Sequence, residues 1–395
     1  MKERPTLGQI LRGVIGAQCA PRLRLSPEQW KVLRALAACR TEALGGQLYY
    51  CASCQREYLV AHSCRNRHCP QCQGAQALDW LDQQEQALLP IPYFHLVFTL
   101  PHELNPLIRQ NRRVMFNLLF ASASRTLLEF GRRELGAKIG LSVVLHTWSQ
   151  TLLDHYHVHC IVTGGGLRLA GGWAKTSSYY LFPVKALSRM YRGKFLAGLK
   201  QLYDEGQLEF HGQLESLAQA TEFGRLQRAA AKQKWVVYAK RPFAGPKQVL
   251  KYLSNYTHRV AISNRRLISA DEQSVSFWYK DYADQERRKT MSLGVEEFVR
   301  RFCLHVLPPR FVKIRHYGLL ANRGRAERLE RARQLLGVET LAVANTTLEL
   351  KTEEQLAAES LVRACCPYCG RRTLVLLREV PPVRLSRNVP VLDSS

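Results

Sequence analysis

Three histidines alternate along residues 154–163, which read DHYHVHCIVT. Side chains at positions i and i+2 of a β-strand point to the same face, so His157 and His159 would project together while Val158 packs on the other side. Two imidazoles at this spacing suit a divalent metal ion, with a third ligand from elsewhere and other positions open to a substrate. Taken alone, the same pattern is also typical of ordinary polar surface at a strand edge.

A pair of tyrosines follows later in the chain, in the segment KYLSNYTHR. Tyr252 and Tyr256 are four residues apart, so on a helix they would share one face, one turn apart. Tyrosine is a weak nucleophile at its ordinary pKa of about 10. Beside a metal ion that polarises a phosphodiester, however, it can hold a nucleic-acid end covalently. The alternative is an amphipathic helix that buries two aromatic rings.

Cysteines crowd into residues 51–72, where CASC and CPQC form two C-x-x-C pairs. Each pair can aim two thiolates at one point, and four thiolates match tetrahedral Zn²⁺, so we expect one closed, structural zinc site. Other metal-binding residues lie in and beside this block, which leaves a second ion as the alternative. The expected ligands are Cys51, Cys54, Cys69 and Cys72; the candidates for a second ion are Cys39, His62, Cys64 and His68.

A third C-x-x-C pair, CPYC, stands alone at residues 366–369. With no second pair after it, we interpret it as a degraded zinc ribbon and expect no metal there. The N-terminus shows no sustained apolar segment of the kind found in secretory signals. The cysteines therefore indicate a reducing compartment and metal binding rather than disulfides, and we expect a cytoplasmic protein.

The charge of the chain is strongly basic, with 57 lysines and arginines against 32 acidic residues and a net charge of +25. Such an excess favours a polyanionic partner, because neutralising phosphates releases condensed counterions. A protein bound to a membrane surface is the competing interpretation, but the sequence has no lipidation motif. It also has no uncharged apolar run of about 18 residues that could span a bilayer.

Periodicity predicts the elements that must position these residues. Short strands alternate with helices through the middle of the chain, which predicts an α+β fold of ferredoxin-like type, an antiparallel sheet with helices on one face. The tyrosine pair would lie on a helix over 246–259. The other expected helices cover 26–39, 75–89, 103–136, most of 167–232, 295–307 and 323–333; the expected strands cover 93–100, 141–150, 157–166, 235–240 and a hairpin within 260–281.

We expect three regions. Residues 1–88 would form a helical N-terminal segment with the zinc-binding domain. Residues 89–345 would form the catalytic domain, with a helical insertion at about 167–232. Residues 346–395 would form a separate C-terminal tail.

The coincidence of a His-x-His strand, a Tyr-x-x-x-Tyr helix and a strongly basic chain resembles the HUH endonucleases. This group contains rolling-circle replication initiators, relaxases and rolling-circle transposases. The segments SCRNRHCPQCQ, FHLVFTLPHELN, HTWSQTLLDHYHVHCIVTGGG, YLSNYTHRVAISNRRL and FVKIRHYGLLAN narrow the resemblance. They are similar to the two-tyrosine rolling-circle transposases of bacterial insertion sequences and their common-region relatives, from about residue 10 to residue 340.

The resemblance implies a site-specific, single-strand DNA endonuclease and strand transferase. His157 and His159 would bind Mg²⁺ or Mn²⁺, which acts as a Lewis acid on the scissile phosphate. One tyrosine, Tyr252 or Tyr256, would attack to give a 5′-phosphotyrosine and a free 3′-hydroxyl, and the second would cut the next strand. The implied partners are single-stranded DNA at the element's ends, target DNA and the host replication machinery.

The third ligand of the catalytic metal stays open. The hairpin preceding His157 offers Gln150, which we rank first, and His146, which we rank second. His155 shares the face of His157 but sits at the mouth of the strand, where it could substitute as a ligand. The basic and polar candidates for contacts with DNA are Arg65, Arg67, Lys251, His258, Arg259, Arg265 and Arg266.

Three rival functions are compatible with parts of the pattern. A plasmid rolling-circle replication initiator or relaxase would use the same catalytic residues, and the zinc block and downstream segments favour a transposase over it. A non-catalytic zinc-finger DNA-binding protein derived from a transposase has no need of the intact histidine and tyrosine pairs. A metallohydrolase that uses metal-activated water would leave the tyrosines without a role.

Overall fold

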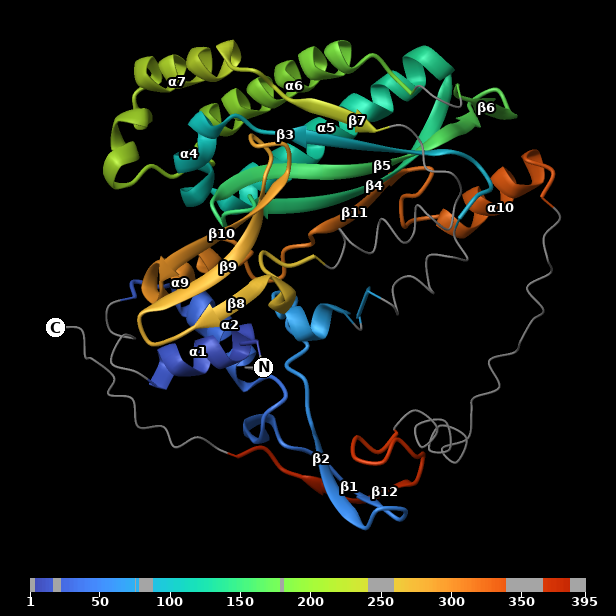
Figure 1. The fold of residues 1–395 in the computed structure, drawn as a ribbon. Helices are drawn as coiled ribbons and strands as arrows, with labels where there is room; N and C mark the ends of the chain where they lie inside the picture. Colours follow the sequence, from blue (N-terminus) through green and yellow to red (C-terminus); the bar gives the residue numbers. More distant parts are fainter. Residues whose placement is uncertain are drawn as a thin grey trace. The chain divides into compact units, whose positions relative to one another are not determined.

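The computed structural model describes residues 4–16, 23–74, 76–77, 88–177, 181–240, 259–338 and 365–383 (Figure 1). The chain forms two compact units, one made of residues 1–73 and 341–395 and the other of residues 74–340. The predicted helix over 246–259 lies almost wholly outside the described residues, and so does most of the helix predicted over 75–89. Four candidate site residues also lie outside the described residues: Lys251, Tyr252, Tyr256 and His258.

The first unit begins with two helices that pack together, α1 (Leu7–Gly16) and α2 (Pro27–Ala38). The start of α2 confirms the predicted N-cap at Ser26. The Ser26 hydroxyl accepts a hydrogen bond from the backbone N–H of Gln29, and the Gln29 side chain accepts one from the N–H of Ser26. This capping box satisfies two backbone donors that the first turn of a helix would otherwise leave without partners. The short η2 (Glu42–Leu44) then leads into the sheet.

The sheet of the first unit joins the two ends of the chain. Strands β1 (Gly46–Cys51) and β2 (Arg56–Ala61) form a hairpin, and β12 (Leu374–Val380) pairs antiparallel with the other edge of β1. Cys51 stands opposite both Arg56 and Leu374. The expectation of a separate C-terminal tail is therefore wrong for residues 365–383, because their backbone hydrogen bonds are made with the N-terminal hairpin.

The second unit is organised around a six-stranded sheet with the order β11–β4–β5–β3–β7 and β6 paired to β5. Every pairing is antiparallel, which confirms the predicted fold class. The predicted hairpin is β4 and β5, both longer than expected. The strands are β3 (Tyr93–Thr99), β4 (Ala137–Trp148), β5 (Asp154–Arg168), β6 (Trp173–Lys175), β7 (Val237–Lys240) and β11 (Ile314–Gly318).

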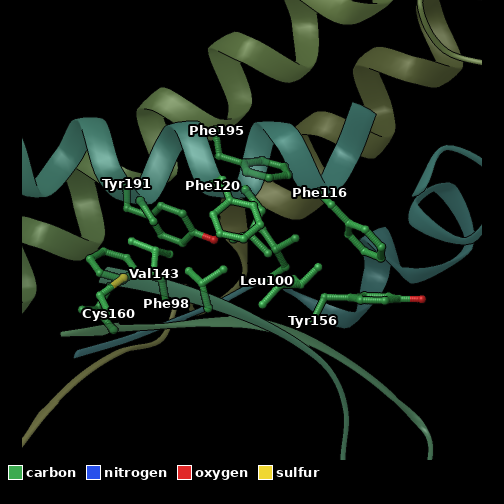
Figure 2. Close-up of a cluster of buried hydrophobic side chains, with 14 of the residues drawn as sticks. Phe98, Leu100, Phe116, Phe120, Val143, Tyr156, Cys160, Tyr191 and Phe195 are labelled. Atoms are coloured by element: carbon green, nitrogen blue, oxygen red, sulfur yellow. The ribbon is translucent and has the colours of Figure 1, made fainter. Parts of the chain in front are cut away.

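Helices cover one side of this sheet, as Figure 1 shows. Phe116 and Phe120 from one helix and Tyr191 and Phe195 from another meet the strands in a closely packed core (Figure 2). The region expected to be a helical insertion thus helps build the core. The elements on this side are η3 (His102–Leu104), α4 (Asn105–Gln110), α5 (Arg112–Leu135), α6 (Val184–Asp204), η4 (Gly212–Ala218) and α7 (Ala220–Lys232).

The side chains on the two faces of β5 have different surroundings. Val158, Cys160 and Val162 are fully buried in the helix-covered core. His157 and His159 alternate with them and so point to the opposite face, as the strand period predicts. Further along that face, Ile161 packs with residues of α10 (Arg325–Leu335). The histidine end of the face is therefore distinct from both apolar cores.

A second, three-stranded sheet with the order β10–β9–β8 completes this unit. The hairpin predicted within 260–281 is β8 and β9, and β10 was not predicted. No helix among the described ranges is long and apolar enough to cross a bilayer. The elements are η5 (Asn264–Arg266), β8 (Leu267–Ala270), β9 (Ser274–Asp281), β10 (Arg287–Gly294) and α9 (Val295–Cys303).

Candidate functional site

Three histidines converge on the face of the six-stranded sheet that lies opposite the core formed with α5 and α6. His146 of β4 stands opposite His157 of β5 in the antiparallel register, and His159 is the next residue on the same face. One ring nitrogen from each of the three lies within 4.8 Å of those of the other two. The ring centroids are 4.5 to 5.4 Å apart. This arrangement matches a metal centre with three imidazole ligands and open positions for a substrate.

The three imidazoles are buried, with 2%, 8% and 9% of the surfaces of His146, His157 and His159 exposed. Burial lowers the pKa of His157 to about 3, and the nearby His155 adds to the effect. Burial also holds the pKa of His159 well below its ordinary value, with His146 and His157 contributing. Both rings are therefore neutral at pH 7, which is the form that binds a metal ion.

Hydrogen bonds orient two of the three rings. His157 Nδ1 lies 2.8 Å from the carbonyl oxygen of His155, so Nδ1–H donates there and Nε2 keeps its lone pair. His159 Nδ1 lies 2.8 Å from Nε2 of His95, a buried residue of β3. When His159 Nδ1–H donates to His95, the lone pair of His159 Nε2 is available as well. The donor set and its supporting hydrogen bonds thus fit a divalent ion.

The structure changes the order of candidates for the third ligand. His146, which the sequence ranked second, lies beside His157 and His159. Gln150 lies two residues beyond the end of β4, in the turn, where its backbone carbonyl accepts a hydrogen bond from Arg266. We therefore place His146 before Gln150. His155 does not join the three-nitrogen group, although its carbonyl orients His157.

Two cations border the histidine face. Arg259 lies close enough for its charge to lower the pKa of both His157 and His159. Lys240, which stands opposite His95 in the pairing of β7 with β3, helps burial to lower the pKa of His95 to about 4. Lys240 and Arg259 are the last described residue before and the first described residue after the stretch 241–258.

The residues predicted to contact DNA differ in how exposed their side chains are. Arg65, Arg259 and Arg265 are exposed, whereas Arg67 is half-buried and burial lowers its pKa. Arg266 is buried, with 9% of its surface exposed, and this burial does not favour the predicted contact with DNA. Its guanidinium instead donates to three backbone carbonyls, those of Gln150, Ala261 and Trp278.

The cysteines divide into two groups rather than the single one expected. Cys69 and Cys72 join Cys39 and Cys64, while Cys51 and Cys54 join Cys366 and Cys369. The predicted set of Cys51, Cys54, Cys69 and Cys72 is therefore wrong. The reason is topological: the hairpin of β1 and β2 carries its C-x-x-C pair toward β12, so each pair meets different partners.

The first group lies within the N-terminal part of the chain. The Sγ atom of Cys39 lies 3.6 Å from the Sγ atom of Cys69 and 3.6 Å from that of Cys72, and Cys64 Sγ lies 3.7 Å from Cys72 Sγ. Four sulfurs around a zinc ion at 2.3 Å would be separated by about 3.8 Å, so the spacing fits a tetrahedral site. His62 and His68, which were candidates for a second ion, belong to neither group.

Sequence reasoning missed one histidine and one arrangement of cysteines. His95 occupies the third position of the segment YFHLVFTL, and a single polar residue inside an otherwise apolar strand was a usable signal. Cys39 and Cys64 were recognised only as spare ligands. The partnership of Cys51 and Cys54 with Cys366 and Cys369 joins positions 312 to 318 residues apart, for which the sequence offers no local signal.

Comparison with known proteins adds independent evidence. A family model described as "Transposase zinc-binding domain" matches residues 14–100, and one described as "Putative transposase" matches residues 140–328. The first span contains the whole Cys39 group, and the second contains His146, His157 and His159. The structure of a conjugative relaxase, TrwC, in complex with oriT DNA in its metal-bound form is a distant match. It has 16% identity and a TM-score of 0.23, covering 42% of this chain and 71% of that one.

Two curated relatives match over most of their length. The protein named "Putative transposase y4qJ" from Sinorhizobium fredii is 41% identical over 94% of this chain and 95% of its own length. The transposase for insertion sequence element IS801 from Pseudomonas savastanoi pv. phaseolicola is 32% identical over 73% of this chain and 69% of its own. Because these relatives align over most of the chain, and the two transposase models match the regions that contain the Cys39 group and the histidine face, this chain belongs to the transposase family of insertion sequence IS801.

Proposed function

We propose that this transposase cuts and rejoins single-stranded DNA through a tyrosine nucleophile next to a metal ion held by three histidines. The observation that carries the proposal is the convergence of His146, His157 and His159, from two paired strands, with their nitrogens within 4.8 Å. Family membership supplies DNA as the substrate class, and the net charge of +25 suits such a polyanion.

The proposed metal ligands are the three histidines, with His95 and the carbonyl of His155 holding two of the rings. A divalent cation bound there would act as a Lewis acid on a non-bridging oxygen of the scissile phosphate. Because three neutral imidazoles suit transition metals better than Mg²⁺, which prefers oxygen ligands, we expect Mn²⁺ to support the reaction better than Mg²⁺.

Tyr252 and Tyr256 are the proposed nucleophiles. They lie outside the described residues, and support for them comes from the positions at which the flanking chain is seen. Arg259 lies at the histidine face and follows Tyr256 by three residues, and three residues of chain span at most about 11 Å. Lys240, at the other end of the stretch, stands opposite His95.

The proposed step is a transesterification that conserves the energy of the phosphodiester. The tyrosine hydroxyl loses its proton and its oxygen bonds to phosphorus, while the bond from phosphorus to the 3′ oxygen breaks. The 3′ oxygen takes up a proton and leaves as a free hydroxyl, which can prime host replication. Attack by a 3′-hydroxyl on the phosphotyrosine then rejoins the strand and releases the tyrosine. A second tyrosine allows the next strand to be cut while the first is occupied.

The exposed cations Arg259 and Arg265 are the proposed contacts to DNA phosphates near the site. Arg65, in the cysteine-rich unit, is a further candidate, and its backbone has a positive φ of 50°. The Cys39 group is the proposed structural zinc site of this unit. With four protein ligands such a site has no open position for catalysis.

The test is the formation of a covalent adduct. The purified protein is incubated with Mn²⁺ and single-stranded oligonucleotides that carry the ends of its element, and the products are separated under denaturing conditions. We expect a DNA-linked protein band from the wild type. The band should be lost in the Tyr252→Phe, Tyr256→Phe double variant and in His157→Ala, with DNA binding retained in both.

Two outcomes would count against the proposal. Full adduct formation by the double tyrosine variant would show that another residue attacks. Cleavage without any adduct would indicate metal-activated water as the nucleophile. Comparing Tyr252→Phe with Tyr256→Phe over a single turnover identifies which tyrosine attacks first.

A further inference from the structure

The second cysteine group has the geometry of a metal site. Cys51 Sγ lies 3.6 Å from Cys369 Sγ, and Cys54 Sγ lies 3.6 Å from Cys366 Sγ. All four sulfurs lie within 4.8 Å of one another. The edge of a zinc–thiolate tetrahedron is about 3.8 Å, so these separations leave room for one ion at the centre.

The two C-x-x-C pairs of this group, at residues 51–54 and 366–369, fold in the same way although they lie far apart in the sequence. The N–H of Gln55 donates to the carbonyl of Cys51, and the N–H of Gly370 donates to the carbonyl of Cys366, each at 2.8 Å. Gln55 and Gly370 both have positive φ, 54° and 71°. Gln55 has a Cβ and adopts this backbone conformation against its preference. Two matching knuckles that face each other are the arrangement of a zinc ribbon.

The surrounding sheet holds the two pairs together. Cys51 ends β1 directly opposite Leu374, the first residue of β12. The N–H of Ala52 donates to the carbonyl of Thr373 at 3.1 Å, and the Thr373 hydroxyl lies 3.1 Å from Cys51 Sγ. The Thr373 side chain thus contacts the Cys51 sulfur, and Thr373 immediately precedes β12. The pairing thus holds Cys51 beside the C-terminal C-x-x-C pair.

Apolar burial is too small to explain the structure around these cysteines. Among the residues that the structure describes, the core here has three buried members, Cys51, Cys366 and Leu374, with Tyr49 and Cys54 packed beside them. A cluster of this size cannot offset the conformational entropy of ordering three strands, and small domains of this kind usually depend on a metal or disulfides. The cysteines therefore have a stabilising role beyond that of small apolar side chains.

We propose that Cys51, Cys54, Cys366 and Cys369 bind a second zinc ion, which fastens the C-terminal strand to the N-terminal hairpin. The matched zinc-binding model ends at residue 100, so it contains only half of these ligands. The proposal does not depend on the nuclease chemistry, because the site belongs to the other unit of the chain. It assigns a structural role to the lone CPYC pair.

Differential alkylation of the wild-type protein tests the proposal without relying on a variant that folds. Cys365 and Cys369 are both exposed, but only Cys369 belongs to the group, which makes Cys365 an internal control. In full-length protein purified with zinc and a phosphine reductant, peptide mass spectrometry should find N-ethylmaleimide on Cys365. We expect Cys369 to react at least about tenfold more slowly until a chelator removes the metal.

Zinc content provides the second measurement. The wild type should contain two zinc ions per chain, and so should Cys365→Ser. Cys369→Ser should contain one, and Cys369→His, which keeps a zinc ligand, should restore the second. Equal labelling of Cys365 and Cys369 in the zinc-loaded protein would overturn the proposal. So would disulfides joining Cys51 to Cys369 and Cys54 to Cys366 in place of bound metal in protein kept under reductant.

Discussion

His95 Nε2 lies 2.8 Å from His159 Nδ1, and the two rings stack with an interplanar angle of 9°. His95 lies on β3, diagonal to His159 of β5, so a neighbouring strand fixes the ring of a proposed metal ligand. Partners of this kind set the tautomer and orientation of ligating histidines, and their removal typically lowers metal affinity by about 10- to 100-fold.

We therefore expect His95→Ala to weaken Mn²⁺ binding by about 10- to 100-fold and to reduce adduct formation at limiting Mn²⁺, with recovery at high Mn²⁺. Titration calorimetry and the adduct assay measure the two effects. His102→Ala is the matched control, because the His102 ring contacts His155 but none of the three proposed ligands. A His95→Ala protein with unchanged Mn²⁺ affinity would show that the hydrogen bond has no part in binding.

Substitution at the third ligand position separates two candidates. If His146 is the ligand, His146→Ala should lower Mn²⁺ affinity by more than the 100-fold upper value typical of a supporting residue. Gln150→Ala should change it less than about twofold, since the described contact of Gln150 is made by its backbone carbonyl. The opposite result would return Gln150 to the metal site. Circular dichroism on both variants checks that the sheet remains folded.

Stability should depend on pH through a buried histidine away from the metal ligands. His305 lies 3.2 Å from the Thr147 hydroxyl and 3.0 Å from the Leu152 carbonyl, and burial lowers its pKa to about 4. Below pH 6.5 the unfolded chain binds a proton that the folded chain does not. The free energy of unfolding should then fall as the pH drops from 6.5 toward 4, by up to about 1.4 kcal/mol per pH unit for this group.

Urea unfolding at pH 7.5 and pH 5 measures this effect. The wild type should lose up to about 2 kcal/mol more between these pH values than His305→Gln, which cannot be protonated. Identical losses for the two proteins would mean that His305 does not contribute to the pH dependence.

Arg265 and Arg266 are neighbours with opposite expected phenotypes. Arg266→Ala should lower the free energy of unfolding by about 2–4 kcal/mol, because three backbone carbonyls lose a charged donor. Arg265→Ala leaves the core intact and should change stability by less than about 0.5 kcal/mol while weakening single-strand binding. Thermal melts and fluorescence anisotropy report the two quantities. A stable Arg266→Ala protein with weakened DNA binding would reverse the assignment.

Local patterns predicted the parts of the fold that depend on local physics. The Ser26 cap, the apolar strand beginning at Tyr93 and the hairpin that carries His157 all follow from side-chain chemistry and periodicity. β10 was missed because its residues, RRKTMSLG, bury little and lack the alternation of a half-buried strand. β11 was not recognised because IRHYG is short and mostly half-buried.

The features that could not be predicted depend on contacts between residues that are far apart in the sequence. Alternation showed that His157 and His159 share a face, but only the register of β4 against β5 places His146 opposite His157. The cysteines show the same limit more strongly. Spacing predicted that the two cysteines of each C-x-x-C pair belong to one group, as they do, but nothing local to Cys51 reveals that its partners stand more than 300 residues later.

The pairing of β1 with β12 also sets an order of events during synthesis. Cys54 and Cys366 are 312 residues apart, which at bacterial translation rates of 5–20 residues per second is about 15–60 s. The hairpin of β1 and β2 is synthesised long before β12. Until β12 follows, one edge of β1 has no partner strand, and Cys51 and Cys54 lack Cys366 and Cys369. All the strands of the six-stranded sheet have been made by the time β12 pairs with that edge. Premature termination before residue 374 would therefore leave β1 without one of its two partner strands and Cys51 and Cys54 without Cys366 and Cys369.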